Sequence, residues 1–131
     1  MATSTILFTP ASSAAVEPVL PDNYNCTQVY YPQGDDNSYQ LSLPFPLKLG
    51  DTEYQDVFVS TNGVMSFGVS DAAYWDYPNT PSISLAGYDW VTWGDGGYLR
   101  YGATDTTLCI QWAVRPFPQS TGDITNITLL V

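Results

Sequence analysis

The chain has 131 residues, the size of one domain, and its 44% hydrophobic and 15% aromatic residues distinguish it from a disordered tail. Three Lys and Arg residues stand against 13 Asp and Glu residues, for a net charge of −10. This balance excludes nucleic acid as an expected partner, because such affinity depends on cations that displace counterions from phosphate. No run approaches the ~18 apolar residues of a spanning helix, so membrane insertion is not expected.

The absence of histidine limits the available chemistry most. Without imidazole there is no Ser-His or Cys-His nucleophile pair, and no zinc or iron site of the ordinary His-bearing kind. Cys26 and Cys109 are too few for a thiolate zinc cluster. They form either one bridge that closes a long loop or two reduced buried thiols, and the reduced state is the simpler expectation. Carboxylates remain as the option for catalysis, and the sequence as a whole predicts a protein that is not an enzyme and needs no cofactor.

The first residues predict an extended N-terminal arm. Ala, Ser, Thr and Pro dominate as far as Pro21, and no helical or alternating period persists there. Proline removes a backbone donor and holds the chain extended. The apolar patch Ile6, Leu7 and Phe8 is a candidate for docking on a partner as a short strand, against the alternative of a loose terminus.

Two segments fit the acceptor pattern for N-glycosylation, Asn25-Cys26-Thr27 and Asn126-Ile127-Thr128. That modification requires secretion in a eukaryote. Met1–Pro10 has no positive residue and only a short apolar patch, so it does not fit an export signal. We therefore discount both patterns, unless the chain is an excised piece of an extracellular protein.

Alternating apolar residues and turn formers predict short strands through the remaining chain, and no window combines helical spacing with capping residues. The expected strands or apolar runs cover residues 26–31, 41–47, 56–60, 64–67, 84–92, 98–101, 108–114 and 124–131. The predicted fold class is all-β, an antiparallel two-sheet β-sandwich with an extended N-terminal arm. We divide it into an arm with the first strand, residues 1–39, and a sandwich domain, residues 40–131.

The strongest hairpin signal is Asn62-Gly63, between the runs DVFVS and VMSF. This dipeptide predicts a type I′ turn with positive φ at both residues, which matches the twist of the flanking strands. Val57 and Val59 are expected to point into the core. Asn62 and Gly63 are thus assigned a structural role in the turn.

Aromatic residues gather in the long loop of residues 69–82 and in the segment that follows it. Trp and Tyr suit interfaces, because one end of each side chain is apolar and the other forms hydrogen bonds. About half of this set is expected in the core. Trp75, Tyr77 and Trp93 are the candidates for contact with a partner subunit or a glycan.

Acidic turns are the remaining candidate sites. Asp35-Asp36-Asn37, and Asp89 with Asp95, offer the hard oxygen ligands that calcium prefers, but neither has EF-hand spacing. Turn formation through Asx hydrogen bonds is the main expectation, and calcium is a minor alternative. The pairs Asp89 with Asp95 and Asp71 with Asp76 could act as acid and base only if burial separated their pKa values. Solvated turns are the expected role of these pairs.

The stretch LPFPLKLGDTEYQDVFVSTNGVMSFG, Leu43–Gly68, resembles the start of nidogen-like modules, with their V-x-x-N-G-x-x-x-F-G hairpin. Leu85–Gly102, Cys109–Phe117 and Ile124–Val131 are similar to later strands of the same family. The family usually continues beyond this point, which predicts a truncated or shortened module. The resemblance implies a β-sandwich used for adhesion or assembly, and it brings no catalytic residues.

The Met start, the arm and the charge also resemble structural proteins of tailed bacteriophages. Our first functional hypothesis is therefore a virion structural or attachment module, such as a tail fibre or capsid decoration protein. Its expected partners are neighbouring virion subunits or copies of itself, with a trimer favoured, and a host-surface glycan. The alternative is an extracellular adhesion or carbohydrate-binding module excised from a larger cell-surface protein.

Overall fold

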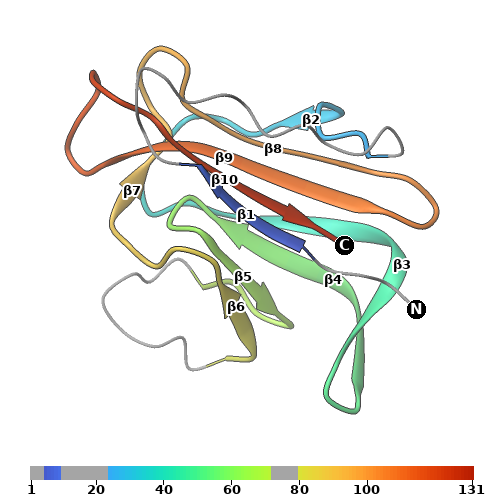
Figure 1. Cartoon of the computed structure of the whole chain (residues 1–131). Coiled ribbons are helices and arrows are strands. Elements are labelled where there is room, and N and C mark those ends of the chain that lie inside the picture. Colours follow the sequence, from blue (N-terminus) through green and yellow to red (C-terminus); the bar gives the residue numbers. More distant parts are fainter. Residues whose placement is uncertain (1–4, 10–23, 72–79) are drawn as a thin grey trace.

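The structure, a computed structural model, describes residues 5–9, 24–71 and 80–131. Within these residues all regular elements are strands, and they lie in two antiparallel sheets (Figure 1), which confirms the predicted all-β sandwich. In the same residues no helix could cross a membrane. The strands are β1 (Thr5–Thr9), β2 (Val29–Tyr30), β3 (Ser38–Leu49), β4 (Thr52–Ser60), β5 (Val64–Phe67), β6 (Ser82–Ser84), β7 (Trp90–Val91), β8 (Tyr98–Ala103), β9 (Leu108–Pro116) and β10 (Thr125–Leu130).

The larger sheet has the order β1-β10-β9-β8-β2, with β7 paired to the end of β9. The smaller sheet has the order β3-β4-β5-β6. The chain therefore enters the larger sheet, builds the smaller one as a meander, and returns to the larger sheet through β7. β1 pairs with β10 of its own chain, with Ile6 opposite Leu129 and Phe8 opposite Ile127.

The core lies between the two sheets, where alternate residues of each strand point inward. Val57 and Val59 of β4 are fully buried, as their alternation predicts. From the opposite sheet, Trp112 of β9 is fully buried in the core, and its indole Nε1 donates to the carbonyl oxygen of Ser60 at 2.8 Å. This bond gives the buried indole a partner and ties the larger sheet to the end of β4.

The apolar run of residues 84–92 is divided between the two sheets. Its first residue, Ser84, ends β6, which pairs with β5, and Trp90 and Val91 near its end form β7, which pairs with β9. The run contains Gly87, and the chain crosses here from one sheet to the other. Alternation alone cannot reveal such a crossing, because each half still buries apolar residues.

Cys26 and Cys109 form a disulfide bridge, which corrects the expectation of reduced thiols. Their Cα atoms lie 5.0 Å apart, although 83 residues separate them in sequence. The bridge joins the segment before β2 to β9, where Leu130 and Tyr24 pack around it. Both cysteines are buried. The sequence did not show whether they lie close enough in space to form a bridge.

Candidate functional site at the acidic and aromatic end of the sandwich

The β4–β5 hairpin forms as predicted, but its turn differs from type I′. Val59 pairs with Met65, and the loop of residues 61–63 connects the strands. Gly63 has a φ of +75°, whereas Asp36 is the non-glycine residue with positive φ in the described part of the chain. The loop is therefore a three-residue connection with glycine in the left-handed position. Asn62 is not among the described residues with positive φ, so the turn lacks the second left-handed residue that type I′ requires.

Asn62 is 0% exposed and joins three segments of the chain. Its Nδ2 donates to Oδ1 of Asp36 at 2.7 Å, and its Oδ1 accepts the backbone N–H of Trp90 at 2.8 Å. Next to it, the backbone N–H of Thr61 donates to the carbonyl oxygen of Asn37 at 2.9 Å. The hairpin loop thus fixes both the turn before β3 and the start of β7.

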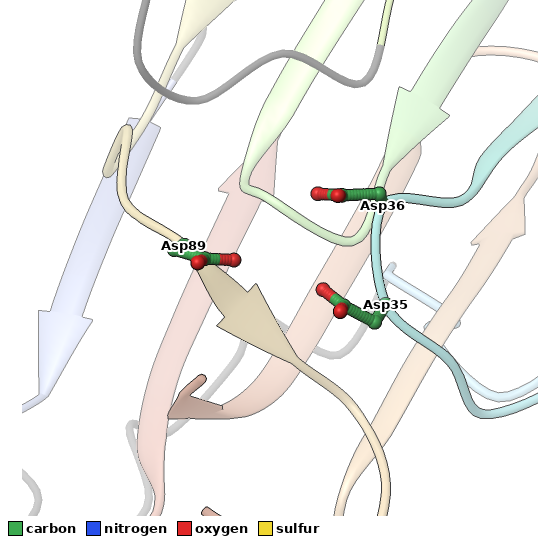
Figure 2. A group of neighbouring side chains, drawn as sticks. All are labelled: Asp35, Asp36 and Asp89. Carbon is green, nitrogen blue, oxygen red and sulfur yellow. The ribbon is translucent and has the colours of Figure 1, made fainter. Parts of the chain in front are cut away.

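Around this anchor lie three carboxylates, those of Asp35, Asp36 and Asp89 (Figure 2). Oxygen atoms from the three groups all lie within 4.8 Å of one another. Asp35 forms an isolated β-bridge with Val91, which holds the turn against β7, and Asp89 immediately precedes β7. The sequence places these residues in two separate turns, and the structure brings their carboxylates together.

The cluster concentrates negative charge on a partly buried group. Burial raises the pKa of Asp35 above its usual range, and the charges of Asp36 and Asp89 raise it further. Oδ1 of Asp35 is enclosed and has no hydrogen-bond partner. Three hard oxygen ligands suit a cation such as calcium, which takes six to eight. The minor expectation of calcium stays a prediction.

Two aromatic pairs flank the carboxylates. The rings of Tyr88 and Trp90 lie 4.9 Å apart, and those of Trp93 and Phe117 lie 5.9 Å apart. Tyr88 is 54% exposed and Phe117 is 46% exposed. The backbone N–H of Phe117 donates to the carbonyl oxygen of Asp89 at 2.8 Å, so the second pair is tied to the acidic cluster.

We call this region the acidic–aromatic end. It consists of Asp35, Asp36, Tyr88, Asp89, Trp93 and Phe117.

A buried arginine holds the loops beneath this surface. Arg115, 4% exposed, donates from Nη2 to the carbonyl oxygen of Asp95 at 2.6 Å, and from Nη1 to that of Trp93 at 3.2 Å. Its Nε donates to the carbonyl oxygen of Gly122 at 3.1 Å. Asp95 thus contributes its backbone carbonyl oxygen as the acceptor for Arg115, and its carboxylate is not part of the carboxylate cluster. The planar fork of guanidinium donors fits such a set of carbonyl oxygens.

Of the three residues predicted for contact with a partner subunit or a glycan, the structure describes Trp93. Trp93 lies at the acidic–aromatic end, where its Nε1 donates to the carbonyl oxygen of Gln119 at 2.8 Å. Trp75 and Tyr77, like Asp76, lie outside the described residues. Sequence reasoning did not single out Phe117, although an apolar residue at the end of a buried strand is a signal that could have found it.

The model of a family described as NIDO related matches residues 8–114. No curated protein and no solved structure matches the chain. The matched range contains the hairpin anchor Asn62 and the whole carboxylate cluster.

Proposed function

The chain belongs to the NIDO-related family. We propose that it is an extracellular, non-enzymatic adhesion or assembly module. It acts by binding another macromolecule through the acidic–aromatic end. The observation that carries this proposal is the juxtaposition of three carboxylates with exposed aromatic rings at one end of the sandwich. No chemical step is needed for such a role.

The disulfide supports an extracellular place for the protein. Such bridges form and persist in oxidising compartments and are rare in the cytosol. Cys26–Cys109 links the N-terminal segment to a central strand, so it constrains the whole fold. Subunits of a tailed phage assemble in a reducing bacterial cytosol, and the bridge therefore favours the extracellular hypothesis over the virion hypothesis. Mass spectrometry of purified virions tests the latter directly.

The chemistry of the surface favours a protein partner that carries arginine or lysine. A guanidinium group can pair with the carboxylates of Asp35 and Asp89 and stack on an aromatic face such as that of Tyr88. The net charge of −10 would speed the approach of a cationic partner. The Trp93–Phe117 pair supports a glycan as the second candidate, because sugar rings stack on aromatic side chains.

The test uses fluorescent streptavidin that carries four biotinylated copies of the chain, since multivalency makes weak binding measurable. We expect the tetramer to stain the extracellular matrix and cell surfaces of the source organism. Staining is expected to fall at high salt, because screening weakens contacts between exposed charges. A broad glycan array tests the second candidate in parallel.

Matched variants assign the binding surface. Tyr88→Ser combined with Phe117→Ser is expected to abolish staining while the melting temperature stays within a few degrees of the parent. Val69→Ser is the control, because Val69 is an exposed apolar residue in another loop. Staining that survives the double substitution contradicts the proposed surface. Hydrolysis of a common polysaccharide that is lost in Asp89→Asn or Asp95→Asn would instead establish an enzyme.

A further inference from the structure

We infer that Asn25 is an acceptor for an N-linked glycan and that Asn126 is not, although both lie in matching sequence patterns. The inference rests on the proposed extracellular function, because only a chain that enters a eukaryotic secretory route meets the transferase. The structural surroundings of the two asparagines differ in exposure, in hydrogen bonding and in the time at which the chain around each becomes ordered.

The segment Asn25-Cys26-Thr27 turns its two recognition residues outward. Asn25 and Thr27 are exposed, and Cys26 between them is buried in the disulfide. Oδ1 of Asn25 accepts the backbone N–H of Thr27 at 3.2 Å and the Thr27 hydroxyl at 3.3 Å. The amide nitrogen Nδ2, the atom to which the transferase attaches the sugar, takes no part in either bond.

The transfer itself needs no change of oxidation state. The amide nitrogen of Asn25 attacks C1 of the first N-acetylglucosamine of a lipid-linked oligosaccharide diphosphate. The new C1–N bond replaces the C1–O bond to the diphosphate, which leaves with the bonding electrons. The nitrogen gives up one proton, and the lipid diphosphate is the second product.

Asn126-Ile127-Thr128 lies within β10, between two neighbouring strands. Asn126 is half-buried and pairs with Thr9 of β1 and Ala113 of β9. Thr128 is 3% exposed, and its hydroxyl oxygen accepts a hydrogen bond from the side-chain Nε2 of Gln111 at 3.3 Å. The hydroxyl that the transferase must recognise is therefore enclosed and engaged.

The order of synthesis favours the same choice. The groups that hold Asn25 in place come late: a Cβ on Gly102 would lie 1.7 Å from the carbonyl oxygen of Asn25, and Cys109 follows Cys26 by 83 residues. At about 5–20 residues per second, ~4–17 s pass before the bridge can close. Asn126 instead follows its hairpin partner β9, and hairpins form in about 1–10 μs. Asn25 thus stays accessible far longer than Asn126.

A glycan on Asn25 is compatible with the proposed binding surface. Asn25 lies against Gly102 near the end of β8, whereas the loop that carries Trp93 precedes the start of β8. The sugar would therefore extend from the opposite end of this strand and leave the acidic–aromatic end uncovered.

The test is to secrete the full chain from eukaryotic cells behind a cleavable leader. The purified protein is reduced, digested with trypsin and treated with a peptide N-glycosidase in ¹⁸O-water. Cleavage after Lys48 and Arg100 separates the peptide with Asn25 from that with Asn126, so occupancy is read at each site. We expect the ¹⁸O label on Asn25 in most molecules and on Asn126 in at least tenfold fewer.

Variants check the assignment. Asn25→Gln is expected to remove the glycosidase-sensitive mass, and Asn126→Gln to leave it unchanged. If Asn25→Gln is not secreted, Thr27→Ala and its conservative control Thr27→Ser separate loss of the acceptor pattern from misfolding. An unmodified Asn25 in secreted, disulfide-bonded protein overturns the inference, as does equal or higher occupancy of Asn126. Either result leaves the adhesion proposal standing, because that proposal is tested separately, by staining with the streptavidin tetramers.

Discussion

The side-chain oxygen of Asn62 accepts the backbone N–H of Trp90 at 2.8 Å, across a separation of 28 residues. This bond connects the hairpin loop of the smaller sheet to the first residue of β7 in the larger sheet. The Asn62 amide nitrogen at the same time donates to Asp36. One fully buried side chain therefore aligns the acidic cluster with the strand that begins at Trp90.

Loss of this side chain should destabilise the fold. Asn62→Ala leaves the N–H of Trp90 without its acceptor, and we expect the free energy of unfolding to fall by about 1–3 kcal/mol. Chemical denaturation measures the change. Asn62→Asp retains an acceptor but places a fourth carboxylate next to Asp36, so its stability should be lower at pH 7 than at pH 4. Equal stability of parent and Asn62→Ala would show that the buried bonds contribute nothing net.

The left-handed conformation of Gly63 predicts a graded response to substitution. Gly63→Val should lower the free energy of unfolding by about 1–3 kcal/mol, because a β-branched residue is strained at a φ of +75°. Gly63→Asn should cost less, since asparagine tolerates this region better. An added Cβ comes no closer than 3.4 Å to Ala86, so backbone strain dominates over collision. Thermal melts compare the variants, and a Gly63→Val protein that melts with the parent contradicts the turn geometry.

The raised pKa of Asp35 predicts a specific pH dependence. The folded state holds this proton more tightly than the unfolded state, so stability falls as pH rises from the ordinary value of 3.8 through the raised one. Asp35→Asn removes that loss, and the variant should melt above the parent at pH 7 and approach it near pH 3. The melts are run with a chelator so that bound cations do not contribute.

Asp105→Asn is the matched control for that experiment, because it removes one negative charge from an exposed turn. Only Asp35→Asn should change the slope of melting temperature against pH. If both variants change it equally, the effect comes from net charge and not from the carboxylate cluster.

The long loop closed by the Cys26–Cys109 bridge predicts a large contribution to stability. Constraining 83 residues of the unfolded chain corresponds to about 4–5 kcal/mol in the chain-entropy model. The double variant Cys26→Ser, Cys109→Ser should therefore lose about 3–5 kcal/mol in urea denaturation. Reduced parent protein is the control and should match it. A parent whose stability is unaffected by reductant contradicts the bridge.

The sequence alone determined the fold class and the hairpin. Val57 and Val59 alternate on one face of their strand, and a two-residue period with turn formers leaves few options other than a sandwich. The resemblance of Leu43–Gly68 to nidogen-like modules identified the family that the comparison confirms. These features are local, because each depends on residues that are neighbours along the chain.

Only the tertiary structure decided the site. Asp35 and Asp36 meet Asp89 because a crossing segment carries β7 to the larger sheet, and Asn62 turns inward to hold it. The bridge between Cys26 and Cys109 likewise requires that the first segment lie against β9. No periodicity encodes such contacts, since they join residues tens of positions apart and arise only when the two sheets pack. Sequence patterns therefore predict the strands, and packing between the strands determines which side chains act together.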